Sequence, residues 1–128
     1  MSHVNTKWEI NGKTYELDLE DADTADRYES AFDLMEKEEK QMPKDGKMSD
    51  RIRAYCKIFE NLYDRIFGEG SGKAILGEKA NTRICNEVYD DFLRFVSTQK
   101  QESLDFQNSM VSKYSPNRAQ RRAAAKQK

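Results

Sequence analysis

The sequence predicts an α+β fold, mainly α, in which an N-terminal β-hairpin packs on a bundle of three to four helices. Asn11-Gly12 lies between two segments of alternating apolar and charged residues, the pattern of a tight hairpin. Apolar residues then recur every three or four positions over most of residues 22–112, which is the period of an α-helix. The composition, 37% hydrophobic and 35% charged, suits helices that each bury one narrow stripe.

The hairpin is expected over residues 4–19. Asparagine and glycine both accept the positive φ angles of a type I′ turn, so a two-residue loop sets the pairing of the strands. Trp8 then faces Tyr15, and Leu17 projects on the same apolar side, while the other side is charged. Because an isolated hairpin is barely stable in water, we expect Trp8 to be buried against a helix.

Long helices are expected at about residues 22–41, 49–67 and 82–112. Oxygen-bearing side chains at residues 21–24 can cap the first, and Gly68 ends the second. In the last segment the apolar spacing fades at residues 97–103 and returns at Leu104, so one long helix and two shorter ones both remain open. Residues 68–72 are rich in glycine and predict a flexible linker, followed by a short turn at residues 73–76.

Residues 1–112 are expected to form one globular domain, and residues 113–128 a mobile basic tail. The tail carries six basic side chains and no acidic one, whereas residues 1–50 carry 14 Asp and Glu against 7 Lys and Arg. Such asymmetry favours a protein that presents oppositely charged parts to macromolecular partners. Within the tail, Arg118, Arg121 and Arg122 are the candidate contact residues.

No motif in the sequence supports catalysis, a cofactor or a metal, so a non-enzymatic protein is predicted. The segment from Gly68 to Lys73 is similar to a phosphate-binding loop but is one residue short, and Ala74 replaces the Ser or Thr that holds magnesium. His3 is the only histidine, which argues against histidine-based chemistry. Cys56 and Cys85 lie in apolar helical patterns and are expected to be buried and reduced.

The location predicted from the sequence is the cytoplasm. No apolar run approaches the roughly 20 residues of a membrane span, and the N-terminus lacks the features of a signal peptide.

The aromatic residues mostly fall on the apolar stripes, where a place in the core is the simplest reading. Tyr55, Tyr63 and Tyr89 flank their stripes and are candidates for the rim of a groove that receives an apolar helical partner. Phe106 and Met110 lie where the last helical segment is expected to extend beyond the core, and they are further candidate partner-binding residues.

Four segments together resemble the small tail assembly chaperones of tailed bacteriophages and prophages, particularly those of Gram-positive hosts. They are Ile10–Leu17, Ile66–Gly70 with Ile75–Gly77, Val88–Phe92, and the arginine-rich Ser115–Arg122. The resemblance implies a non-catalytic protein that binds the tape-measure protein and keeps it soluble until tail-tube subunits assemble around it. The tail-tube protein is then a second candidate partner, and self-association is left open.

The alternative is a nucleic-acid-associated or regulatory adaptor that acts through its basic tail, with an enzyme subunit as a remote third. Six basic charges without an adjacent aromatic platform give weak and salt-sensitive binding to phosphates. The acidic first half of the chain would also repel a polyanion. Nucleic acid is therefore the less favoured partner.

Overall fold

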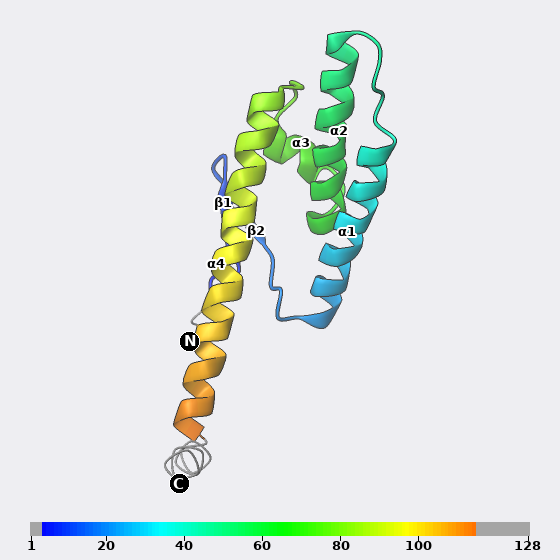
Figure 1. The fold of residues 1–128 in the computed structure, drawn as a ribbon. Coiled ribbons are helices and arrows are strands. Elements are labelled where there is room, and N and C mark those ends of the chain that lie inside the picture. The colour runs from blue at the N-terminus through cyan, green and yellow to red at the C-terminus, as the bar shows by residue number, and fades with distance from the viewer. Residues whose placement is uncertain (1–3, 115–128) are drawn as a thin grey trace.

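The computed structural model describes residues 4–114 and confirms the predicted fold class, a mainly helical protein with an N-terminal antiparallel hairpin. The elements are, in order, β1 (Lys7–Ile10), β2 (Lys13–Glu16), α1 (Ala22–Lys40), α2 (Met48–Phe67), α3 (Ser71–Leu76) and α4 (Thr82–Tyr114). Figure 1 shows α1 and α2 as an antiparallel pair, with the short α3 between α2 and α4. Within residues 4–114, no helix has both the length and the hydropathy needed to cross a membrane.

The hairpin has the register that its two-residue loop predicts. Trp8 pairs with Tyr15, and the loop residues Asn11 and Gly12 have φ angles of 51° and 73°, as a type I′ turn requires. The regular strands are shorter than the predicted span of residues 4–19, but the amide of Leu17 still donates to the Thr6 carbonyl at 2.7 Å. The pairing therefore continues by one hydrogen bond beyond β1 and β2.

Trp8 is buried between the hairpin and the helices, as the sequence predicts, with 2% of its surface exposed. Its ring lies 5.0 Å from that of Phe92 on α4 and 5.9 Å from that of Tyr63 on α2. The indole nitrogen donates to a carboxylate oxygen of Asp91 at 2.8 Å, so the polar atom of the ring is satisfied as well.

A single buried side chain of α4, Gln99, holds the open end of the hairpin. Its amide nitrogen donates to the carbonyls of Asn5 and Leu17 at 3.1 and 2.8 Å, and its oxygen accepts from the Leu19 amide at 2.8 Å. Gln99 is 1% exposed, and these bonds compensate the cost of burying its amide group.

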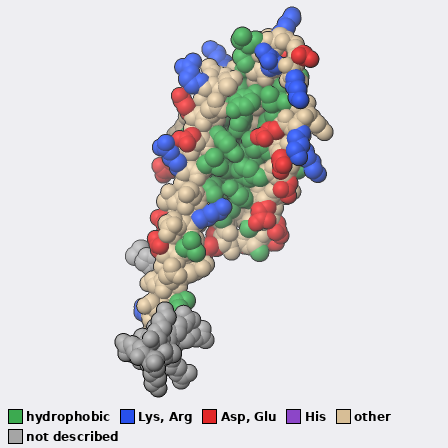
Figure 2. All heavy atoms as spheres, viewed as in Figure 1, with side chains coloured by type: hydrophobic (Ala, Val, Ile, Leu, Met, Phe, Trp, Pro, Cys, Tyr) green, Lys and Arg blue, Asp and Glu red, His purple; other side chains and the backbone are tan. Residues whose placement is uncertain are grey.

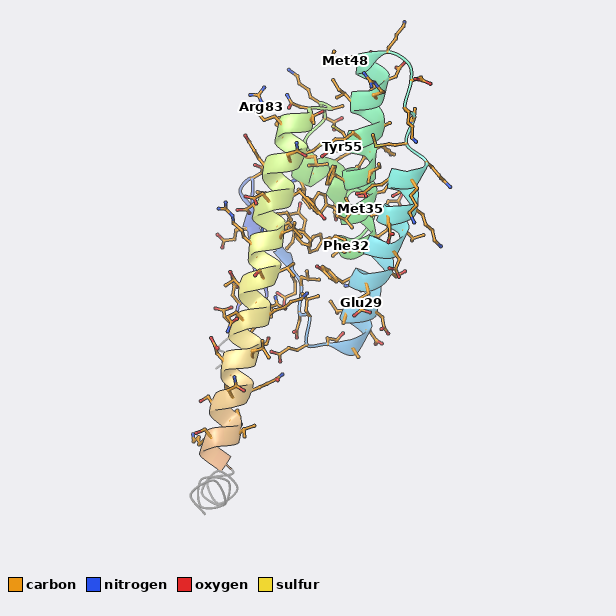
Figure 3. The ribbon with its side chains drawn as sticks, viewed as in Figure 1. Glu29, Phe32, Met35, Met48, Tyr55 and Arg83 are labelled. Carbon is orange, nitrogen blue, oxygen red and sulfur yellow. The ribbon has the colours of Figure 1, made fainter. Side chains whose placement is uncertain are left out.

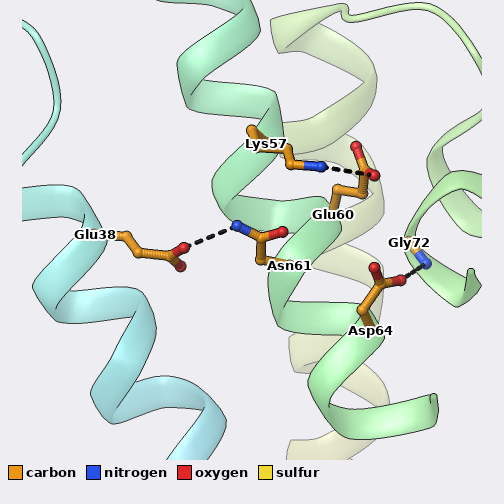
Figure 4. Close-up of polar contacts among 6 residues, drawn as sticks. All are labelled: Glu38, Lys57, Glu60, Asn61, Asp64 and Gly72. Carbon is orange, nitrogen blue, oxygen red and sulfur yellow. Dashed lines mark hydrogen bonds and ion pairs between the residues drawn. The ribbon is translucent and has the colours of Figure 1, made fainter. Parts of the chain in front are cut away.

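Helix α2 is the centre of the bundle, because α1, α3 and α4 all pack on it. Its buried residues are Cys56, Ile58, Phe59, Leu62, Tyr63 and Ile66. A polar contact joins it to α1, where Glu38 accepts from Arg65 at 2.8 Å and, as Figure 4 shows, from Asn61, also at 2.8 Å. Partial burial by itself raises the pKa of Glu38, but these hydrogen bonds outweigh it and the net pKa is lowered.

The glycine-rich segment is not the flexible linker that the sequence suggests, because Gly72 is a buried residue of α3. A Cβ atom at this position would lie only 2.3 Å from the backbone oxygen of Glu60, so α3 approaches α2 at a distance that only glycine allows. The Gly72 amide donates to Asp64 at 2.7 Å (Figure 4). Glycine here serves close packing between two helices.

Helix α4 is a single helix of 33 residues, which resolves the choice between one helix and two. Gln99 is its last buried residue, and beyond it Leu104 and Val111 are 53% and 59% exposed. Figure 1 shows this C-terminal part extending past the other elements. The helix includes Lys113 and Tyr114, so it ends later than the predicted residue 112, and residues 115–128 of the predicted basic tail lie outside the described residues.

Candidate interaction surface

Four half-buried aromatic side chains form a surface between α1 and α4, which we call the aromatic face. They are Tyr28 and Phe32 of α1, Tyr55 of α2 and Tyr89 of α4. Figure 2 shows hydrophobic side chains gathered in a band between these helices. The band is open because α1 and α4 each pack on α2 and scarcely contact one another. An apolar surface thus remains where a further helix would complete the bundle.

The buried Phe59 of α2 supports one part of the aromatic face. Its ring lies 5.0 Å from that of Tyr55 and 5.0 Å from that of Tyr89, edge to face in both pairs. The hydroxyl of Tyr55 donates to the side-chain oxygen of Asn86 on α4. These contacts hold both tyrosines in place, so the surface is formed before any partner arrives.

The other part of the aromatic face belongs to α1. The rings of Tyr28 and Phe32 lie 4.8 Å apart, and that of Tyr28 lies 6.4 Å from the buried Phe92 of α4. The ammonium group of Lys100 lies over the Tyr28 ring at 5.7 Å, a cation–π distance. Figure 3 shows Phe32 and Tyr55 on the sides of α1 and α2 that face α4.

The tyrosines of the aromatic face are neutral at ordinary pH. Burial raises the pKa of Tyr28, Tyr55 and Tyr89 above the usual value near 10.0. The carboxylate of Glu39 also acts to raise the pKa of Tyr55 and Tyr89, so Glu39 lies close to this surface.

A row of glutamates on α1 borders the aromatic face, and we call it the acidic edge. Glu29, Glu36 and Glu39 stand three, four and seven residues from Phe32, and such spacings place them on the same side of the helix. Figure 2 shows acidic side chains along the α1 border of the hydrophobic band. Figure 3 shows Glu29 one turn before Phe32.

The structure brings two of the predicted rim residues together and corrects the third. Tyr55 and Tyr89 flank Phe59 on the aromatic face. Tyr63 was expected beside them, but this prediction is wrong because its side chain is 0% exposed in the core. Its hydroxyl has no hydrogen-bond partner in the described structure, and burial raises its pKa above the usual value.

The remaining predicted residues do not join the aromatic face. Phe106 and Met110 line a hollow of about 350 Å³ on the extending part of α4, and Met110 is 39% exposed. Seventeen residues of helix separate Phe106 from Tyr89, a distance of about 25 Å. Arg118, Arg121 and Arg122 lie outside the described residues.

Tyr28 and Phe32 lie on the apolar stripe of the helix expected at residues 22–41, and aromatic residues on such stripes were predicted to lie in the core, so the place of these two on the surface was missed. One signal was present in the chain. A row of glutamates that follows the spacing of an aromatic residue on one helix indicates that the residue lies at the edge of the core.

Cys56 and Cys85 are both buried, as the sequence predicts, and both are free cysteines. Burial raises the pKa of the Cys85 thiol to about 12, and its contact with Cys56 acts in the same direction. The thiolate that reacts with electrophiles or metals is therefore disfavoured. Among residues 4–114, no group of three or more His, Cys, Asp or Glu side chains is placed to hold a metal ion.

Comparison with known proteins gives a family. No match to a curated protein or to a solved structure was found. A family model described as a family of unknown function (DUF6673) matches residues 11–125. Since the matched residues span most of the 128-residue chain, the protein belongs to the DUF6673 family.

Proposed function

We propose that this protein is a phage tail assembly chaperone that binds the tape-measure protein and keeps it soluble during tail assembly. It acts in the cytoplasm of the bacterial host and performs no catalysis. The observation that carries the proposal is the aromatic face, which offers four half-buried rings on a fixed helical frame. The resemblance of four segments of the chain to such chaperones supports the same role.

The aromatic face suits a helical client. An amphipathic helix laid between α1 and α4 buries its apolar stripe on Tyr28, Phe32, Tyr55 and Tyr89, the helix-in-groove mode of recognition. Tyrosine is well adapted to such a surface, because its ring is apolar while its hydroxyl tolerates water before the client binds. A tape-measure protein is long and helical, so its exposed apolar stripes would aggregate without such cover.

Co-expression with the tape-measure protein encoded in the same genome tests the proposal. We expect the chaperone to raise the soluble fraction of the client, and the double variant Tyr55→Ser, Tyr89→Ser to lose most of this effect. Thermal melts must first establish that the variant is folded. Client solubility that is the same with the wild type, the variant and no chaperone would refute the proposal.

Ile84→Ser is a matched control for these variants. Ile84 is also an apolar residue of α4 and is 39% exposed. It stands five residues before Tyr89, which places it about 140° away around the helix and off the aromatic face. We expect this variant to protect the client as well as the wild type does.

The composition of the C-terminus favours the second candidate, an adaptor that contacts nucleic acid. Five of the six basic residues of the tail lie in residues 115–128. A variant without residues 115–128 distinguishes the two functions. It should keep its fold, because the buried residues of the described structure all lie between Trp8 and Gln99. A chaperone keeps most of its client protection in the truncated form, whereas an adaptor loses all retardation of DNA or RNA in a gel.

A further inference from the structure

The two borders of the aromatic face differ in charge. On the α1 side lie the three glutamates of the acidic edge. On the α4 side, Asn86 and Leu93 stand one turn before and after Tyr89, and Leu93 is 38% exposed. The carboxylates of α4 nearby are engaged elsewhere, with Asp90 paired to Arg94 at 3.0 Å and Asp91 accepting from the hairpin.

The charges of the acidic edge are largely available to a partner. Neither Glu29 nor Glu39 forms an ion pair with a basic residue of the described chain. Glu36 pairs with Lys40 at 3.4 Å, but both side chains are mostly exposed, and such a pair contributes little to stability. Three carboxylates in one row beside an apolar surface set up a local negative potential.

From these two observations we propose that the aromatic face binds a basic amphipathic helix, whose apolar stripe covers the four aromatic rings and whose Lys and Arg side chains run along the acidic edge. This inference rests on the proposed chaperone function and specifies the segment of the client that is recognised. The acidic edge also fixes which way the helix is rolled about its axis, because the opposite roll places its basic row on the α4 side, where the ammonium group of Lys100 lies over the Tyr28 ring.

Residues 115–128 of this same chain are the competing occupant. They carry five basic residues and no acidic one, so they match the acidic edge in charge. Their apolar residues, however, are Pro116 and four alanines, which lack the large side chains that cover aromatic rings. The aromatic face therefore favours a client helix with larger apolar residues.

Two fluorescent peptides of about 18 residues, or five helical turns, test the proposal with the full chain. Both carry the same leucine stripe, and the row beside it is lysine in one and glutamate in the other. By fluorescence anisotropy at about 0.05 M salt we expect the basic peptide to bind about tenfold more tightly. The ratio should shrink at about 0.5 M salt, where charges are screened.

Charge reversal on α1 assigns the preference to the acidic edge. Glu29→Lys with Glu39→Lys should remove or reverse the preference for the basic peptide. Glu9→Lys with Glu16→Lys is the matched control, because it makes the same change in net charge at two exposed residues of the hairpin rather than on α1. The control should keep the preference of the wild type.

Three outcomes would overturn the inference. In the first, both peptides bind the wild type equally well and Tyr55→Ser with Tyr89→Ser abolishes this binding. The chaperone proposal would then stand, but the preference for a basic helix would not. Equal loss of preference in both charge-reversal variants would mean that only net charge matters. A peptide of residues 115–128 that binds the truncated chain as tightly as the basic peptide would make the tail the occupant. Failure of the chaperone proposal itself is recognised separately, by the co-expression result.

Discussion

At the scale of single residues, one indole connects the hairpin to two helices. Trp8 comes from β1, packs against the rings of Tyr63 on α2 and Phe92 on α4, and donates its indole hydrogen bond to Asp91 of α4. Gly72 makes a contact possible because it has no side chain, so the backbone of α3 can approach that of α2 closely. Each of these two residues therefore determines how two elements of the fold pack together.

Replacing Trp8 by alanine should cost about 3 to 5 kcal/mol of the free energy of unfolding, because a large and almost fully buried ring is removed. Trp8→Phe keeps much of the apolar contact but loses the hydrogen bond to Asp91, so its cost should be smaller. Denaturant melts of both variants measure the two values. A loss below about 1 kcal/mol for Trp8→Ala would show that the indole does not support the core.

Gly72→Ala should destabilise the protein by at least about 2 kcal/mol, because the new methyl group meets backbone atoms of Glu60 that cannot turn aside. Lys73→Ala, at an exposed position one residue later, is the control and should change stability by less than about 0.5 kcal/mol. Equal melting temperatures of Gly72→Ala and the wild type would show that α3 is free to move away from α2.

At the scale of elements, the turn and the register of the hairpin could be predicted to the residue, although its regular strands are shorter than the predicted span. The two-residue Asn11-Gly12 loop specifies both the turn and the pairing, so Trp8 opposite Tyr15 follows from sequence alone. The end of α2 was predictable for a similar reason, since Gly68 follows the last helical residue with a φ of 113°. Local chemistry decided both features.

The width of the buried surface on α2 could not be predicted. The spacing of apolar residues along α2 shows which side of the helix faces the core, but not how many other helices pack around that side. Since α1, α3 and α4 all pack on α2, its buried arc is wide enough to enclose Tyr63. Glycine at position 72 was equally ambiguous, because the same residue serves a flexible loop and a close helix contact.

The candidate site was predictable in part. Tyr55 and Tyr89 flank their stripes, and a tyrosine in that place indicates a border between core and water. Tyr28 and Phe32 lie within their stripe, and their exposure depends on the distance between α1 and α4. That distance is set by how both helices pack on α2, and no local pattern in the chain encodes it.

The contact of α4 with the open end of the hairpin should depend on Gln99. Gln99→Leu keeps the size of the side chain but leaves the Leu19 amide and two carbonyls without their partner, at a cost of about 1 to 3 kcal/mol. Hydrogen exchange should show faster exchange of the Leu19 amide. Gln101→Leu, on the exposed side of α4, should leave that amide protected.

At the scale of the whole molecule, acid should weaken the link between α1 and α2. The pKa of Glu38 is lowered in the folded state from 4.5, so its stabilising contribution is complete above pH 4.5 and is lost as the pH falls through the folded pKa. Denaturant melts of the wild type and Glu38→Gln should differ by up to about 1 kcal/mol at pH 7, and the difference should shrink as the pH falls below 4.5.

Glu36→Gln is the control for this comparison, because the ion pair of Glu36 with Lys40 is exposed on the surface of α1. It should change stability little at any pH. A difference between the wild type and Glu38→Gln that does not shrink as the pH falls below 4.5 would mean that Glu38 acts through packing rather than charge.

The length of α4 fixes how far this helix extends beyond the core. Tyr114 stands 15 residues after the buried Gln99, so the helix extends about 22 Å past that residue. A client helix of about 15 residues spans the same length. Under the proposed function, a client can contact both the aromatic face and the hollow at Phe106 and Met110, and inserting four residues after Leu104 would change the separation of these two surfaces by about 6 Å.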